Sequence, residues 1–199
     1  MAGFIYLASQ SPRRRQLLEQ IGVRLELLLP DDADAAEALE SERAGEAPAA
    51  YVRRVTRLKL DDALRRLRDR RLPPAPLLCA DTTVALGRHI LAKPRDAQDA
   101  GAMLRRLSGQ THRVITAVAV QAGAARHEVL SSSRVRFAIL SDADIADYID
   151  SGEWAGKAGA YAIQGRAAAF IEHISGSYSG IMGLPLFETA ALLRQAGVR

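Results

Sequence analysis

Residues 4–22 read FIYLASQSPRRRQLLEQIG, an apolar run followed by a segment with helical spacing. The run FIYLA is typical of a short strand. Ser11 is a residue type preferred at helix N-caps, and Pro12 suits the first helical position, where its missing N–H costs nothing. Apolar residues then recur at helical spacing: Leu17, Leu18 and Ile21. The stretch predicts a strand at 4–8 and a helix at 12–21, the opening unit of an α/β fold.

Three arginines, Arg13, Arg14 and Arg15, fall in the first turn of this helix. The unpaired N–H groups of a first turn carry about half a positive charge, which disfavours each cation by roughly 0.3–1 kcal/mol. A bound anion would reverse that penalty, and a helix N-terminus that follows a strand is a ready phosphate site. From the residues alone, a phosphate site and a solvated basic turn both stay open.

The rest of the chain alternates further strands with helices. Strands are expected at 24–29, 77–86, 111–121 and 128–140, with HILA as a short partner strand, and helices at 48–70, 97–107, from a cap at Asp142 to Ile149, and in GLPLFETAALLRQAG. Because hairpins occur beside strand–helix units, the pattern favours a mixed α/β sheet over a purely parallel one. The acidic loop PDDADAAEALE and the Gly-rich segment 151–182 are expected to mark the mouth of a cleft between two lobes.

Composition limits the class of protein. The 199 residues are 48% hydrophobic and 25% charged, as in an ordinary globular protein. No run approaches the roughly 18 apolar residues of a membrane span, and the N-terminus lacks a signal-peptide pattern. We expect a cytoplasmic protein without membrane contact. The single Cys79 has apolar neighbours, which predicts a buried structural thiol rather than a nucleophile.

The net charge of +4 is unevenly distributed. Residues 52–71 hold nine Lys/Arg against three Asp, a net charge of +6. Such a run can touch nucleic acid, but it is more often the solvated face of a surface helix, and we favour the second interpretation.

Three residues break the pattern of their own segments. Lys59 falls within the apolar stripe of helix 48–70, where a lysine must either snorkel to solvent or point to an anion. Asp81 follows the apolar run LLCA, which suits a base or metal ligand at a strand end or a turn aspartate. Lys93 precedes Pro94 and is therefore held extended, either as a loop lysine or within reach of a phosphate.

The segment KAGAYAIQGR, residues 157–166, combines two glycines with a lysine and an amide. Glycine lets backbone approach a ligand closely. Gln164 carries an acceptor and two donors, which match the edge of uracil or thymine but also that of guanine. A polar loop is the alternative. The four histidines show no metal-ligand spacing and are expected to be surface or core residues.

Several blocks in order resemble the Maf family of nucleotide pyrophosphatases, nearly from end to end. They are LASQSPRRRQLL, ADTTV, AKPRDAQDAGAMLRRLSGQTHRVITAVAV, KAGAYAIQG and GSYSGIMGLPLFET. The resemblance implies an α/β fold with an elongated mixed β-sheet flanked by helices and a single domain, 1–199, with two lobes around a central cleft. It implies hydrolysis of a nucleoside triphosphate to the monophosphate and pyrophosphate, with Mg²⁺ or Mn²⁺.

The resemblance also assigns roles residue by residue. Ser9 and Arg13 match the first loop and would hold phosphates, while Arg14 and Arg15 are expected to be exposed. Lys59 and Lys93 match two further phosphate-binding lysines, and Asp81 matches the proton acceptor. Positions linked to substrate choice are matched by Arg13, Thr82 and Gln164. The pattern AY-x-IQG resembles the branch that prefers dTTP and UTP, whereas a sister branch prefers 7-methyl-GTP.

Two departures from the family pattern concern acidic residues. The family usually has an acidic pair after the second strand; here Asp34 is the best match for a metal ligand beside Asp81, with Asp32 as the alternative. The family's Asp before KAGAY is Gly156 in this chain. Under the older description of the family as septum-formation inhibitors, the basic helix 52–71 could instead bind nucleic acid or a division partner. The sequence leaves open whether the chain forms a homodimer.

Overall fold

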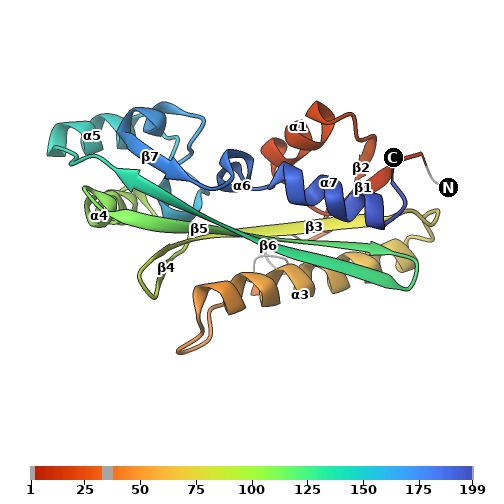
Figure 1. Ribbon diagram of the computed structural model, residues 1–199. Coiled ribbons are helices and arrows are strands. Elements are labelled where there is room, and N and C mark those ends of the chain that lie inside the picture. Colours follow the sequence, from red (N-terminus) through yellow and green to blue (C-terminus); the bar gives the residue numbers. More distant parts are fainter. Residues whose placement is uncertain (1–2, 33–37, 199) are drawn as a thin grey trace.

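A seven-stranded mixed sheet organises the computed structural model, which describes residues 3–32 and 38–198 (Figure 1). Its strands are β1 (Ile5–Leu7), β2 (Leu25–Leu27), β3 (Leu77–Leu86), β4 (His89–Leu91), β5 (Thr111–Ala122), β6 (Ala125–Phe137) and β7 (Ile171–Ser175). The order is β2-β1-β3-β5-β6-β7, with β4 paired to β3. β1 pairs in parallel with β2 and β3, and the other pairings are antiparallel. The predicted mixed α/β sheet is confirmed.

Helices cover both faces of the long strands. They are α1 (Pro12–Gln20), α3 (Pro48–Asp69), α4 (Ala97–Leu107), α5 (Asp142–Asp150), α6 (Tyr178–Met182) and α7 (Leu186–Gln195), with 3₁₀ turns at Ala158–Ala160 and Arg166–Phe170. Figure 1 shows α3 along one face of β3, β5 and β6. It shows α1 and α7 on the opposite side at one end, α4 and α5 at the other end, and α6 between them. The sheet is thereby buried on both sides over much of its length.

The boundaries that differ from the sequence prediction include both ends of β6, which runs over 125–137 rather than 128–140, and the cap of α5. β6 begins at Ala125, three residues earlier than expected, because Gly123 adopts a φ of 57° and closes a two-residue hairpin loop. The cap of α5 is Ser141 rather than Asp142. The Ser141 hydroxyl accepts a hydrogen bond from the Asp144 N–H, and the Asp144 side chain accepts one from the Ser141 N–H, a complete capping box.

The apolar stripe predicted for the long helix is the buried face of α3. Its residues Val52, Val55, Leu60 and Ala63 are fully buried, and Leu60 and Ala63 pack with Leu77, Cys79 and Ala119 of the sheet. Cys79 is buried as predicted, and burial raises the pKa of its thiol to about 11. α3 is thus held firmly against β3, which fixes where Lys59 can reach.

A gap in strand pairing lies along one edge of β3. β1 pairs with Leu77 and Leu78 only, and β4 pairs with 84–86. Among the strands that the structure describes, residues 79–83 therefore have no pairing partner on that edge, although β5 pairs with them on the other. Because the neighbouring strands stop here, side chains from both faces of β3 can meet in one opening.

Candidate active site

A cavity of about 540 Å³ occupies this gap. Six of the predicted site residues line it: Ser9, Arg13, Lys59, Asp81, Thr82 and Lys93. Its described lining carries six cationic side chains (Arg13, Arg14, Lys59, Arg66, Lys93 and Lys157) and three carboxylates (Glu40, Asp62 and Asp81). The excess of positive charge makes this cavity suited to a polyanion.

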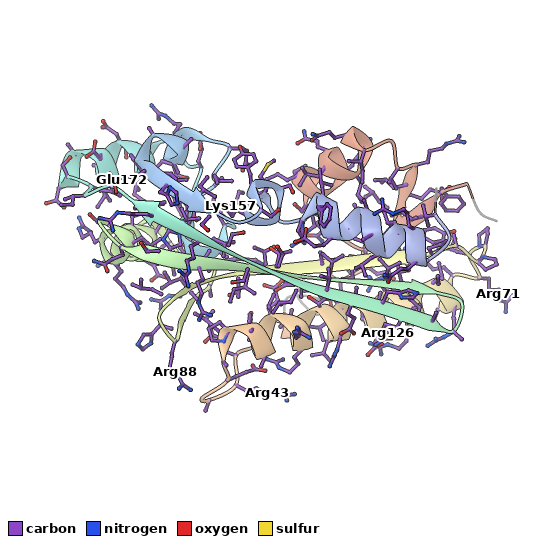
Figure 2. The ribbon with its side chains drawn as sticks, viewed as in Figure 1. Arg43, Arg71, Arg88, Arg126, Lys157 and Glu172 are labelled. Carbon is purple, nitrogen blue, oxygen red and sulfur yellow. The ribbon has the colours of Figure 1, made fainter. Side chains whose placement is uncertain are left out.

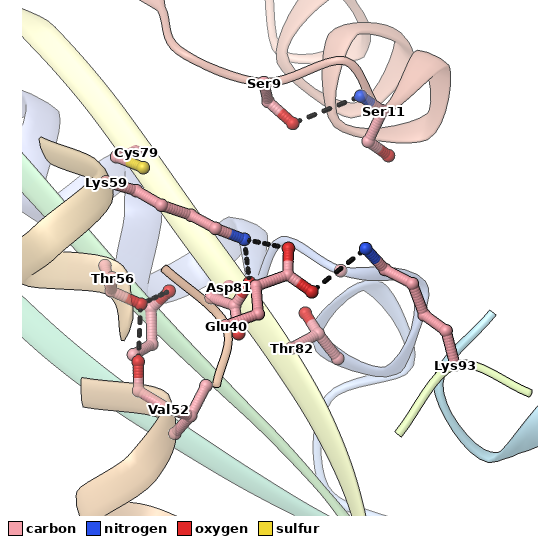
Figure 3. Close-up of polar contacts among 12 residues, drawn as sticks. Ser9, Ser11, Glu40, Val52, Thr56, Lys59, Cys79, Asp81, Thr82 and Lys93 are labelled. Carbon is pink, nitrogen blue, oxygen red and sulfur yellow. Dashed lines mark hydrogen bonds and ion pairs between the residues drawn. The ribbon is translucent and has the colours of Figure 1, made fainter. Parts of the chain in front are cut away.

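Lys59 of α3 reaches the cavity and binds two carboxylates there (Figure 3). Its Nζ lies 2.6 Å from Oδ1 of Asp81 and 2.6 Å from Oε1 of Glu40. The other Glu40 oxygen, Oε2, lies 2.9 Å from Nζ of Lys93. These contacts link four charged side chains from four separate segments of the chain. Lys59 therefore points to anions in the cavity, the functional one of its two predicted alternatives.

The mutual attraction of these groups outweighs their burial. Burial acts to lower the pKa of Lys59, but attraction to Asp81 and Glu40 leaves it raised. Burial acts to raise the pKa of Glu40, but Lys59 and then Lys93 leave it lowered. Both residues are consequently held in their charged forms at neutral pH.

Asp81 lies in the middle of β3, not at a strand end as predicted. Its side chain is largely buried on the α3 side, and its register partner on β5 is Ala117. The prediction was wrong because β3 continues past Asp81, through the buried Thr83, to Leu86. The strand end that exposes Asp81 belongs to the neighbour, β1, which stops at Leu7.

Glu40 is a charged cavity residue that the sequence reasoning missed. It ends the acidic loop in which a metal ligand was sought at Asp34 or Asp32. Asp34 lies outside the described residues, and Asp32 is exposed. No local pattern distinguished Glu40 from the other acidic residues of this loop. Glu40 and Asp81 together offer carboxylate oxygens on one side of the cavity.

The three arginines in the first turn of α1 have different surroundings. Arg15 is exposed, as predicted, and it pairs with Glu19. Arg13 lines the cavity, and its buried Nε has no hydrogen-bond partner among the described residues. Burial, and secondarily the charge of Arg14, lower the pKa of Arg13. The expectation for Arg14 was wrong: it is partly buried and lines the cavity, because contacts with two distant segments draw it inward.

The far end of the cavity is apolar. Its lining there includes Val84, Val114, Tyr161, Ile163 and Ile181. Val84 is three residues beyond Asp81 on β3, which at about 3.3 Å per residue is roughly 10 Å. The cavity thus joins a charged end to an apolar end over a distance that suits a nucleotide.

A buried histidine supports this apolar end. His112 Nε2 lies 2.8 Å from the hydroxyl of Tyr161, and both rings contact Phe137 edge-on. Burial lowers the pKa of His112 to about 4, so the ring is neutral at pH 7. His112 is a core residue, one of the two expected roles for the histidines.

The 157–166 segment is only partly in the cavity. Lys157 lines it and lies near the middle of the molecule in Figure 2, whereas Gln164 is exposed and is not among the described lining residues. The two glycines serve internal packing rather than ligand approach. A Cβ on Gly159 would lie 2.9 Å from the Val84 side chain, and one on Gly165 would lie 2.0 Å from Glu153 Oε2.

The basic run 52–71 lies mostly on α3. Five of its arginines form ion pairs with carboxylates: Arg54, Arg57, Arg65, Arg66 and Arg70. Figure 2 shows Arg126 beside this helix, where it pairs with Asp61. The pairing neutralises much of the run, as expected for a solvated helix face.

The described ranges, 3–32 and 38–198, contain neither a helix long and apolar enough for a membrane nor a group of three or more His, Cys, Asp or Glu side chains suited to a metal ion.

Comparison with known proteins gives consistent matches. The sequence matches the family described as Maf-like protein over residues 4–196. It is 64% identical over 199 residues to a protein of Albidiferax ferrireducens named dTTP/UTP pyrophosphatase, with 100% of each chain covered. Proteins with the same name from Polaromonas sp. and Cupriavidus pinatubonensis are 64% and 63% identical, each covering 100% of this chain and 98% and 100% of their own.

Proposed function

The chain belongs to the Maf family, and from this premise we propose that it hydrolyses nucleoside triphosphates, with dTTP and UTP preferred, to a nucleoside monophosphate and pyrophosphate. The observation that carries the proposal is the convergence of Arg13, Lys59, Asp81 and Lys93 on one cavity. A triphosphate needs several cations, and an attacking water needs a base. On this proposal residues 1–199 act as one domain whose two lobes flank the cavity.

Asp81 is the proposed proton acceptor. It takes a proton from the water that attacks the α-phosphorus while the bond to the pyrophosphate leaving group breaks. General-base assistance of this kind contributes about 10²–10⁴ in rate. The Lys59 ammonium, 2.6 Å from Asp81 Oδ1, holds the carboxylate in place before the substrate arrives.

The cations of the cavity neutralise the negative charge of the triphosphate. Ser9, Arg13 and the N-terminus of α1 would hold phosphate oxygens at one wall, and Lys59 and Lys93 at the other. A phosphate there would give the buried Nε of Arg13 the partner it lacks among the described residues.

A divalent cation, Mg²⁺ or Mn²⁺, fits the carboxylates of the cavity. Hard cations prefer oxygen ligands. Oδ1 of Asp81 and Oε1 of Glu40 both lie 2.6 Å from Lys59 Nζ, so they are at most twice that distance, 5.2 Å, apart. Asp81 and Glu40 would hold the ion, with Asp34 as the further ligand proposed from the sequence. When bound, the ion supplies neutralisation of phosphate charge.

The base would occupy the apolar end, beside Tyr161 and Ile163. Thr82 and Gln164 remain the proposed determinants of pyrimidine preference. For the exposed Gln164 this requires that the side chain turn toward the base when nucleotide is bound.

A nucleotide panel tests the function. The protein is incubated with dTTP, UTP, CTP, GTP and 7-methyl-GTP in the presence of Mg²⁺, and pyrophosphate release is measured. Release ranked highest for dTTP and UTP supports the proposal, whereas highest release from 7-methyl-GTP would assign the sister activity. No release, together with salt-sensitive DNA binding, would favour an interaction protein acting through the basic helix.

A further inference from the structure

Arg14 donates three hydrogen bonds to other segments of the protein. Nε donates to the carbonyl of Gly183 (2.8 Å), Nη1 to Oγ of Ser9 (3.2 Å) and Nη2 to Oγ1 of Thr82 (3.3 Å). These partners come from the first loop, from β3 and from the loop after α6. One planar group thus ties together three walls of the cavity, and Arg14 differs in this from Arg13 beside it.

The hydrogen bonds fix the direction of the Thr82 hydroxyl. Thr116 Oγ1 lies 2.8 Å from the Gly180 carbonyl, which can only accept, so the Thr116 proton is used there. Thr116 Oγ1 also lies 2.8 Å from Thr82 Oγ1, and that contact must therefore use the Thr82 proton. Thr82 also accepts a hydrogen bond from Arg14. Its hydroxyl therefore has one acceptor position left for a ligand in the cavity.

The Ser9 hydroxyl, unlike that of Thr82, keeps its proton available for a hydrogen bond to a ligand. Its Oγ accepts from Arg14 Nη1 and from the backbone N–H of Ser11, each at 3.2 Å. A hydroxyl has two acceptor positions and one proton. Both acceptor positions are occupied, so Ser9 can offer only its proton to a ligand in the cavity.

We propose that Arg14 is a positioning residue that sets Ser9 as a hydrogen-bond donor and Thr82 as a hydrogen-bond acceptor toward the substrate. A donor matches a phosphate oxygen, which only accepts. An acceptor matches a sugar hydroxyl or a base N–H, and it excludes phosphate as the partner of Thr82. This assignment rests on the proposed function, because it assumes that a nucleotide binds in the cavity.

The test is a double-mutant cycle with inorganic pyrophosphate as the probe, because pyrophosphate meets Ser9 without the nucleoside. Calorimetry compares wild type, Ser9→Ala, Arg14→Lys and the double variant. Lysine keeps the positive charge but cannot span three acceptors. Each single change should weaken binding about tenfold, the size expected for a hydrogen bond to a charged group. The double variant should be little weaker than either, because both changes remove the same interaction.

Multiplicative losses, about a hundredfold in the double variant, would overturn the proposal, as would a wild type that fails to bind pyrophosphate. Arg15→Lys is the matched control, from the same helical turn but exposed, and should bind as wild type does. Near-UV circular dichroism establishes that each variant is folded.

Thr116→Val tests the Thr82 assignment and does not depend on the folding of Arg14→Lys. Removal of the Thr116 hydroxyl frees the Thr82 proton, so Thr82 is no longer held as an acceptor toward the nucleoside. UTP affinity should therefore fall severalfold, while pyrophosphate affinity stays unchanged. An equal fall for both would place Thr82 on phosphate and overturn the assignment. A wild type that binds pyrophosphate but hydrolyses none of the nucleotides would refute the proposed function alone, and the pyrophosphate cycle would still decide the role of Arg14.

Discussion

Nζ of Lys59 on α3 lies 2.6 Å from Oδ1 of Asp81 on β3, an ion pair that joins the long helix to the open edge of the sheet. The side chains of Lys59 and Asp81 are only 20% and 10% exposed, so water screens their attraction weakly. The proposed base is therefore held in one position before substrate enters. An incoming phosphate would compete with Asp81 for the same ammonium group.

Asp81→Asn should abolish most turnover and change nucleotide affinity little. The amide cannot accept the proton, so kcat for UTP should fall by about 10²–10⁴. Pyrophosphate release and nucleotide binding are measured on the same preparation. Asp69→Asn, an exposed position at the end of α3, is the control and should be indistinguishable from wild type. Near-normal turnover in Asp81→Asn would mean that the base is another residue.

Glu40→Gln should raise the Mg²⁺ concentration needed for half-maximal turnover. The substitution replaces a charged oxygen ligand with a neutral amide and removes the negative charge that pairs with both Lys59 and Lys93. Turnover is titrated with Mg²⁺ at saturating UTP. Glu42→Gln, two residues away and exposed, should leave the titration unchanged. An unchanged titration for Glu40→Gln would remove Glu40 from the proposed metal ligands.

Gln164→Ala should raise KM for UTP with little effect on folding. The side chain is exposed, so the free energy of unfolding should change by no more than about 0.5 kcal/mol. KM values for UTP, CTP and GTP are compared with the urea midpoint. A selective increase for UTP supports base recognition, whereas an equal loss toward every nucleotide would make Gln164 structural.

His112 should make the protein less stable as the pH falls from 7 to 4. Its pKa is lowered from 6.5 to about 4 by burial, so between these values the unfolded chain binds a proton that the folded chain excludes. At 1.36 kcal/mol per pKa unit, wild type should lose about 3 kcal/mol over this range through His112. Urea unfolding at each pH is compared for wild type and His112→Asn.

The His112→Asn variant should lack that part of the pH dependence, while exposed His89→Asn should retain it. Equal slopes for wild type and His112→Asn would show that the folded and unfolded chains bind a proton at His112 equally, and would contradict the lowered pKa.

Local pattern was enough for most of the secondary structure. The helices expected at 12–21, 48–70 and 97–107 correspond to α1, α3 and α4 within one residue at each end. Each has a sharp start signal and a long apolar periodicity. The start of β6 was missed because it depends on the hairpin glycine Gly123. The cap of α5 was missed because Ser141 and Asp142 are both residue types that suit a helix N-cap, and the capping box selects Ser141.

The sequence by itself determined which residues are anomalous: a lysine in an apolar stripe, an aspartate in an apolar run, and arginines at a helix start. Such anomalies are visible because burial and helix dipoles have local rules. Only the tertiary structure decided what they meet. Arg14 donates to a carbonyl 169 residues away, and Lys59 to carboxylates 19 and 22 residues away on either side. No local rule relates residues at such separations; the sheet and the packing of α3 bring them within hydrogen-bond distance.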